Sequence, residues 1–287
     1  MLRAAKINNV IKRGSSVPII ASDEQGNEFF VKAKGAGDGL TALIADWIVT
    51  SVGHKLGLPI LKPEIIIIDE ETLNNYPHEE VSDLIKRSYG ANLAYKYFPD
   101  AQIYNALSPH PDFDRDIKDL IFLFDSFFVN IDRTKDNPNI FNSKNNIYAV
   151  DFGASFLIKE IFDNIPYCRN VEIQKLLKRN IFYNESADVS LMLDRLGSMT
   201  KEQVSEIIDA FPDEWIAGSR VTKNELSGKL FILLNKENHL TEALEVLKKI
   251  ELPSDEEIRM KKAANKKKFE EKAFGDVLPL MPPSKRY

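Results

Sequence analysis

The sequence predicts an α+β fold with two lobes, a β-rich N-terminal lobe and a mostly helical C-terminal lobe. Short apolar runs separated by turn-forming clusters dominate the first third of the chain, which is typical of strands. Apolar residues recur at helical spacing through most of the remainder. One hairpin pattern, at residues 139–150, interrupts that helical region. We therefore expect an N-terminal lobe over residues 1–100, a helical lobe over 101–255, and a Lys-rich helix with a proline-containing tail over 256–287.

Composition and charge narrow the classes of protein. Of 287 residues, 38 are basic and 43 are acidic, and the net charge of −5 argues against a nucleic-acid partner. The single cysteine, Cys168, excludes an intrachain disulfide and a cysteine-based zinc site, and favours a reducing, cytoplasmic setting. Residues 1–14 lack the apolar core of a signal peptide. The apolar runs at 65–68 and 121–131 are too short to span a bilayer, so we expect no membrane association.

The N-terminal lobe is predicted to contain four strands. Apolar runs at 17–21 and 28–34 flank a turn cluster at 23–27, which is the pattern of a hairpin. Residues 63–68 are almost wholly apolar and predict a central strand. Residues 93–98 are a further strand candidate, ended by a proline.

One helix is predicted inside this lobe. Three glycines between residues 35 and 39 break the chain after the hairpin. Apolar residues at helical spacing then predict a helix over 40–56, with Thr41 as its N-cap and Gly57 at its C-terminal stop.

The helical lobe is predicted to begin with a helix over residues 116–130, followed by a hairpin formed by 139–141 and 147–150. The spacing of Thr200 and Gln203 is that of a capping box. Aromatic residues at positions 122, 124, 127, 128 and 141 are expected in the core. Further helices are predicted at residues 171–179, 190–196, 201–211, 223–235, 239–250 and 255–273.

The strongest functional signal is a polar loop before this hairpin and an Asp-Phe-Gly turn after it. Asp132 and Asn137 precede the first strand, and Asp151 opens the turn that follows the second. Because antiparallel strands bring those two ends of a short hairpin together, we expect the three side chains to converge. They offer only oxygen ligands, which suits Mg²⁺. The alternative is a turn-rich hairpin whose Asp and Asn side chains merely cap loops.

Such a convergence is what phosphoryl transfer needs. Asp132 is the candidate that accepts or orients a substrate hydroxyl, and Asn137 and Asp151 are the candidates that hold Mg²⁺ on ATP. A small-residue loop ahead of the first predicted strand is the candidate whose backbone N–H groups approach the phosphates. Its residues are Gly14, Ser15 and Ser16.

A basic residue and a carboxylate complete the candidate site. The strand over residues 30–34 places Lys32 and Lys34 on one face, so alternation does not choose between them. Asp46, on the following helix, is the candidate partner of that lysine. The alternatives are a solvated lysine on an edge strand and a solvated carboxylate on a helix surface.

With these residues in place, the chain resembles the HipA-like kinases, a bacterial branch of the protein-kinase-like superfamily. The Asp-Arg-x-x-x-Asn pattern within it is shared with phosphoinositide kinases. Four stretches within residues 10–220 carry the resemblance. Two lie in the N-terminal part: residues 14–18, and residues 31–35 leading into the helix that ends at 56–59. The other two are residues 130–139 with the following hairpin and 151–153, and residues 211–215.

The resemblance implies a two-lobed protein-kinase-like fold that binds ATP and Mg²⁺ between its lobes. It selects Lys32 as the lysine that contacts the phosphates. It matches Asp132 to the catalytic aspartate, and Asn137 and Asp151 to the metal ligands. It also implies a hinge that meets adenine through backbone groups, formed by Lys96, Tyr97 and Phe98.

The implied reaction is transfer of phosphate to a Ser or Thr of a protein, with the chain's own Ser15 or Ser16 among the candidate acceptors. Some relatives act as toxins with a separate antitoxin, so an antitoxin or other regulatory partner is compatible with the resemblance. One alternative is a kinase of small molecules or lipid headgroups. Another is a pseudokinase, favoured by Asp46 where the family usually has Glu and by Thr134 where many relatives have His, and opposed by the intact catalytic and metal-binding residues.

Overall fold

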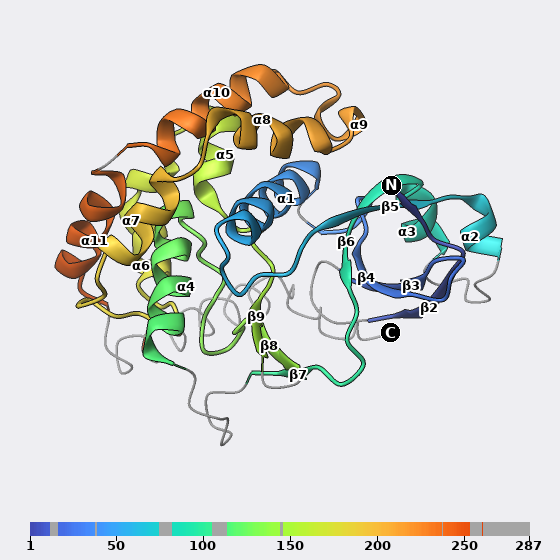
Figure 1. The fold of residues 1–287 in the computed structure, drawn as a ribbon, viewed down its shortest axis with the longest axis horizontal. Coiled ribbons are helices and arrows are strands. Elements are labelled where there is room, and N and C mark those ends of the chain that lie inside the picture. Colours follow the sequence, from blue (N-terminus) through green and yellow to red (C-terminus); the bar gives the residue numbers. More distant parts are fainter. Residues whose placement is uncertain are drawn as a thin grey trace, which may run out of the picture. The chain divides into compact units, whose positions relative to one another are not determined.

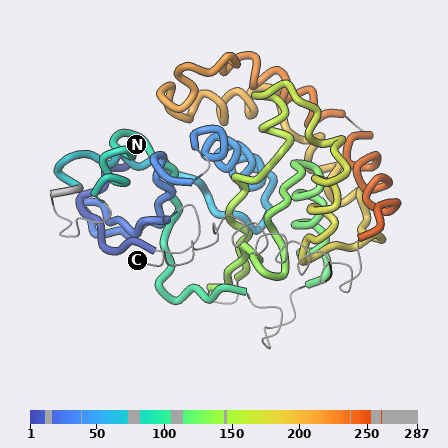
Figure 2. The backbone as a smooth tube through the Cα atoms, turned by 180° about the vertical axis from the view of Figure 1, so that it is seen from behind, coloured from blue at the N-terminus to red at the C-terminus, as the bar shows by residue number. Residues whose placement is uncertain are grey.

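The computed structural model describes residues 1–11, 17–37, 39–74, 82–104, 114–143, 146–236, 238–252 and 260. The chain divides into two compact units, Met1–Ile250 and Glu251–Tyr287. The first unit has the predicted α+β architecture, a β-sheet followed by a helical part (Figures 1 and 2). The phosphate-loop residues Gly14, Ser15 and Ser16 lie outside the described residues, as does nearly all of the predicted helix over 255–273.

The sheet of the N-terminal lobe has six strands in the order β1-β5-β6-β4-β3-β2. The predicted hairpin is confirmed, because β3 (Ile19–Ser22) and β4 (Glu28–Lys32) pair in antiparallel register. β5 (Glu64–Ile68) lies between β1 and β6, which confirms its central position. β6 (Gly90–Lys96) begins three residues before the predicted strand, and two further strands were not predicted, β1 (Leu2–Arg3) and β2 (Lys6–Val10).

Helix α1 (Leu40–Lys55) follows the sheet's fourth strand, as predicted, but the expected N-cap at Thr41 is wrong. Gly39 is the N-cap: its φ of 81° is a conformation that glycine adopts without strain, and its carbonyl accepts the first helical bond, from Leu43. Gly57 ends the helix with a φ of 68°, where a C-terminal glycine belongs.

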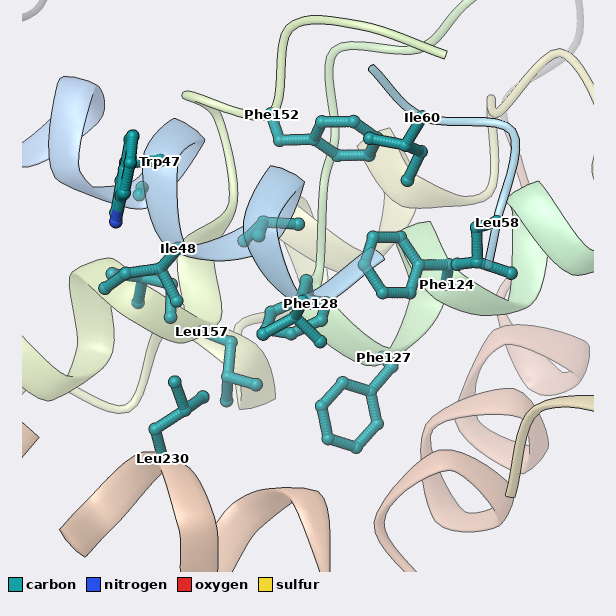
Figure 3. Close-up of a cluster of buried hydrophobic side chains, with 14 of the residues drawn as sticks. Trp47, Ile48, Leu58, Ile60, Phe124, Phe127, Phe128, Phe152, Leu157 and Leu230 are labelled. Carbon is teal, nitrogen blue, oxygen red and sulfur yellow. The ribbon is translucent and has the colours of Figure 1, made fainter. Parts of the chain in front are cut away.

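Helix α1 is buried on every side and belongs to the core of the helical lobe. All residues from Leu43 to Gly53 are buried, which is typical of a helix enclosed by neighbours. It packs against α5 (Phe156–Asp163), α8 (Lys201–Ala210) and α9 (Asp213–Ile216). Figure 3 shows Ile48 of α1 in one cluster with Phe128, Leu157 and Leu230.

The helical lobe begins with α4 (Arg115–Phe128), whose aromatic side chains fill the core as predicted. Phe141, which was also expected in the core, lies outside this helix and is only partly buried. The predicted hairpin is confirmed as β8 (Ile140–Ser143) and β9 (Asn146–Ala149), to which β7 (Gln102–Ile103) adds a third strand. The remaining helices are α2 (Glu70–Asn74), α3 (Ser82–Arg87), α6 (Val171–Leu177), α7 (Ser190–Gly197), α10 (Lys223–Leu234) and α11 (His239–Lys249), with a 3-10 turn at Tyr167–Arg169.

Side-chain caps fix several helix starts. The predicted capping box is confirmed, because Thr200 and Gln203 each bond the other's backbone N–H at the start of α8. Thr222 and Glu225 form a second box at the start of α10. Within the described part of the chain, no helix is both long and apolar enough to cross a membrane.

Candidate active site

A buried ion pair shapes the loop that follows α4. The helix ends at Val129, whose φ of 54° turns the chain away from the helix axis. The Arg133 guanidinium then reaches back to Asp125 of α4, with 2.7 Å between Nε and Oδ2 and no solvent exposure of either side chain. The amides of Asn130 and Asn180 donate to the same carboxylate, at 2.8 and 2.7 Å. These bonds satisfy the buried charges and fix the loop.

Arg133 also joins the two ends of the hairpin. Its Nη1 donates to the carbonyls of Asn139 and Val150, which precede β8 and follow β9. The guanidinium lies over the ring of Phe152, 4.8 Å from its centroid. One fully buried side chain therefore holds the loop of Asp132 beside the turn that carries Asp151.

Asp132 is oriented by two amides. Asn137 donates to its Oδ2 at 2.8 Å, and Asn139 donates to the same oxygen at 3.2 Å. Burial raises the pKa of Asp132 above its ordinary value, despite these hydrogen bonds and with a contribution from the charge of Asp151. Oδ1 of Asp132 accepts no hydrogen bond from the residues that the structure describes.

Lys32 of β4 binds two carboxylates. Its Nζ lies 2.5 Å from Oδ2 of Asp46 and 2.6 Å from Oδ1 of Asp151. Burial of the ammonium disfavours its charge, yet the charges of Asp151 and Asp46 raise the pKa of Lys32 well above its ordinary value. Burial likewise opposes the charge of Asp151, and Lys32 lowers the pKa of Asp151 below its ordinary value. Lys32 and Asp151 are therefore both charged at neutral pH.

The carboxylate of Asp46 is held from three sides. Besides Lys32, it accepts hydrogen bonds at Oδ1 from the backbone N–H of Phe152, at 2.8 Å, and from the hydroxyl of Thr50, at 3.2 Å. Thr50 also bonds the buried hydroxyl of Tyr95 on β6. With its short side chain, Asp46 therefore reaches Lys32 through one oxygen and the backbone of the Asp-Phe-Gly turn through the other.

The oxygen atoms of Asn137 and Asp151 fit a magnesium ion. The Nδ2 of Asn137 donates to Asp132, so its Oδ1 is the atom left for a cation. Asp151 supplies a carboxylate in a left-handed backbone conformation, with a φ of 61°. The described residues contain no group of three or more His, Cys, Asp or Glu suited to a metal. Two oxygen ligands suit Mg²⁺, which takes its remaining ligands from water and phosphate.

Four of the residues described above line one pocket. Its volume is about 110 Å³, and its lining includes Lys32, Asp46, Asp132 and Asp151, together with the glycine-containing turn ahead of α1. The second lysine that the sequence left open, Lys34, is paired elsewhere: its Nζ lies 3.1 Å from Oε2 of Glu214. Of the two lysines, Lys32 is the one that contacts the carboxylates of the candidate site.

The expected hinge begins at Lys96, the last residue of β6. The N–H of Tyr97 donates to the carbonyl of Glu28, 2.9 Å away, and so continues the pairing of β6 with β4. The ring of Phe98 stacks on Tyr148, with centroids 5.7 Å apart, and Lys96 Nζ lies 5.9 Å from the Phe98 centroid. Adenine contact through these three residues stays a prediction.

Sequence reasoning gave no role to Arg133, Asn139 or Asn180. One signal was available for the buried pair: Asp125 interrupts the apolar run 121–131, and a buried carboxylate requires a partner. The side-chain amide of Asn139 donates its hydrogen bond to Asp132 from a residue with a left-handed backbone, with a φ of 49°. No sequence pattern indicated that conformation.

The chain is similar to a family of kinases and, in its fold, to a solved kinase. A family model described as HipA-like kinase matches residues 4–242. The proinflammatory kinase CtkA of Helicobacter pylori is similar over 86% of this chain and 98% of its own, with 11% identity and a TM-score of 0.50. The Golgi casein kinase is similar over 87% of this chain and 74% of its own, with 11% identity and a TM-score of 0.48. A search of curated proteins gave no match.

Proposed function

The chain belongs to the HipA-like kinase family, and we propose that it transfers the γ-phosphate of ATP to a hydroxyl group in a Mg²⁺-dependent reaction. The observation that carries this proposal is the placement of Lys32. One ammonium contacts both the carboxylate of α1 and the carboxylate of the Asp-Phe-Gly turn, in a pocket that also contains Asp132. Charged groups fixed in this way are the main means by which proteins catalyse phosphoryl transfer.

Each residue has a distinct part in the proposed reaction. Lys32 binds the phosphate oxygens while Asp46 holds its ammonium in place. Oδ1 of Asp132, left free by the two amides on Oδ2, accepts the hydrogen bond of the acceptor hydroxyl and orients it toward the phosphate. Asn137 and Asp151 hold Mg²⁺. When bound, the ion neutralises charge on the phosphates.

We propose a Ser or Thr of a protein as the acceptor, in a cytoplasmic setting, in line with the family. A separate antitoxin or regulatory partner is compatible with that assignment. The pseudokinase alternative loses much of its support, because Asp46, despite its shorter side chain, makes the ion pair with Lys32. A kinase of small molecules or lipid headgroups remains the second candidate, because the pocket residues bind phosphate and metal without selecting the acceptor.

The test is phosphate transfer from γ-labelled ATP with Mg²⁺, with the purified protein alone and with bacterial protein extract. The Asp132→Asn variant is the control. Label on a protein band that is lost in the variant supports a protein kinase. Consumption of ATP without protein labelling, in the presence of small alcohols or inositol phosphates, favours the second candidate. No consumption under any condition contradicts both.

A further inference from the structure

Two consecutive side chains of α9 hold both backbone groups of one residue in the sheet. Oε1 of Glu214 accepts the N–H of Ala91, at 2.6 Å, and Nε1 of Trp215 donates to the carbonyl of Ala91, at 2.9 Å. Ala91 lies at the start of β6 and is 123 residues from Glu214. A short helix at the edge of the helical lobe thus binds the main chain of the N-terminal sheet.

On the side of β6 that faces β4, Ala91 has no strand partner, whereas on the other side it is paired in register with Ile67 of β5. β4 pairs with β6 from Phe29↔Lys96 as far as Lys32↔Leu93, after which the chain turns toward α1. The position opposite Ala91 would be Lys34, but the N–H of Lys34 donates to the side chain of Asn92 instead. Because an unpaired buried peptide group is costly, α9 stabilises the end of β6 by taking the place of a strand.

An ion pair and a glycine complete this contact. Lys34 Nζ lies 3.1 Å from Oε2 of Glu214, so the carboxylate bonds both the chain that leaves β4 and the start of β6. Gly90 has a φ of 102°, and a Cβ there would lie 2.7 Å from Lys34 Nζ and 2.8 Å from the Glu214 oxygens. We call Lys34, Gly90, Ala91, Glu214 and Trp215 the α9 bracket.

The bracket is anchored in the rigid core of the helical lobe. Trp215 is 2% exposed, stacks on Phe211 and meets Trp47 of α1 edge to face, with centroids 6.1 and 6.3 Å apart. Trp47 in turn donates its Nε1 to the carbonyl of Ile207 on α8, at 2.9 Å. The α9 residues that bind the sheet are therefore packed against α1, the helix that carries Asp46.

We propose that Glu214 and Trp215 are positioning residues that hold the sheet, and with it Lys32, over Asp151. β6 is joined to the helical lobe by the chain at its C-terminal end and by the α9 bracket at its N-terminal end, so the sheet is restrained at two points. The catalytic consequence rests on the proposed kinase function, whereas the restraint on the sheet does not. Lys34, which follows the end of β4, also lines the pocket, but its ammonium is paired with Glu214 of the bracket.

Loosening the bracket has a specific kinetic signature. A sheet that is aligned for only a fraction of the time binds ATP more weakly in proportion to that fraction. Saturating ATP restores alignment, since the phosphates themselves bind Lys32. We therefore expect the KM for ATP to rise in each single variant by up to about fivefold, the factor equivalent to one ordinary hydrogen bond, with kcat changed less than about twofold.

The experiment compares Trp215→Phe, which keeps the ring but removes the N–H, and Glu214→Ala with the unaltered protein. Glu206→Gln is the matched control. Glu206 lies on the neighbouring helix α8, and the change removes only its exposed ion pair with Lys55 of α1. The measurements are KM and kcat for ATP, thermal stability, and hydrogen exchange of the β4 and β6 amides. Exchange is expected to quicken across both strands in the two bracket variants and to stay unchanged in the control.

Two results would overturn the proposal. Unchanged KM and unchanged exchange in β4 would show that the bracket does not restrain the sheet. A fall in thermal stability and in active fraction, with KM unchanged, would show a structural role alone. If the unaltered protein transfers no phosphate, the kinase proposal fails by itself, and the exchange of the strand amides still decides whether the bracket holds the sheet.

Discussion

The Arg133 guanidinium and the Asp125 carboxylate form an ion pair, 2.7 Å from Nε to Oδ2, in which neither side chain is exposed to solvent. Removing two charges from water is expensive, and the cost is met by the amides of Asn130 and Asn180 and by carbonyls at both ends of the hairpin. This arrangement places the loop of Asp132 against the Asp-Phe-Gly turn.

Breaking this pair should destabilise the whole protein. Asp125→Asn leaves the Arg133 charge buried without a counter-charge, so we expect the free energy of unfolding to fall by about 3 to 5 kcal/mol. Urea denaturation followed by circular dichroism measures the change. Glu206→Gln, which removes an exposed pair, should lower it by less than about 1 kcal/mol. Equal, small effects in both variants would show that the buried pair has no special structural weight.

The Asp46 carboxylate should be needed for activity rather than for folding alone. Lys32 pairs with two carboxylates, and Asp46→Asn removes the charge of one of them. The ammonium is then left paired with Asp151, the proposed metal ligand, alone. We expect phosphate transfer to fall about tenfold or more. Thr50→Val, which removes one hydrogen bond to the same carboxylate, should have a smaller effect. Full activity of Asp46→Asn would contradict the role given to the Lys32 pair.

Metal-dependent binding should depend on Asp151. Asp151→Asn removes the charged ligand of the proposed Mg²⁺ site, so we expect it to lose the gain in ATP affinity that Mg²⁺ gives the unaltered protein. Isothermal titration with and without Mg²⁺ measures this difference. Equal affinity of both proteins for ATP·Mg²⁺ would contradict the assignment of Asp151 as a metal ligand.

Stability should decrease at mildly acidic pH because of His239. Burial, together with the charge of Lys236, lowers the pKa of His239 against the opposing effects of the Phe127 backbone, Glu160 and Glu242. The unfolded chain takes up a proton as the pH falls through about 6.5, while the folded protein resists it, so folding stability is lost on acidification.

The size of this effect can be isolated with one variant. Between about pH 7.5 and about pH 5.5 we expect His239 to lower the free energy of unfolding. His239→Leu, which has nothing to titrate, should show a correspondingly shallower pH dependence in urea denaturation. The same dependence in both proteins would assign the loss to other groups.

The sequence predicted the fold where spacing is regular and failed where local geometry breaks it. Most helices and the two hairpins were found from apolar periodicity. β2 was missed because its register shifts between Ile7 and Asn9, which interrupts the alternation that marks a strand. α9, with four residues, is too short to show a helical period. Its role depends on a contact with Ala91 that no local pattern reveals.

The candidate site was predicted in part for a similar reason. Hairpin geometry was enough to bring Asp132 near Asp151, because both flank one short ribbon. Alternation alone could not separate Lys32 from Lys34; that required the tertiary contacts of each lysine. Asn139, which helps to orient Asp132, has a left-handed backbone, and its carbonyl accepts a hydrogen bond from the distant side chain of Arg133, a tertiary contact that no local pattern indicates.

The most direct test of the central claim compares nucleotide binding and phosphate transfer in the Asp132→Asn variant. The account places Asp132 on the acceptor hydroxyl, with ATP bound by other residues. We therefore expect the variant to bind ATP·Mg²⁺ with an affinity close to that of the unaltered protein, while transfer from γ-labelled ATP falls by about a hundredfold or more. Undiminished transfer by the variant, or no ATP binding by either protein, would contradict the account.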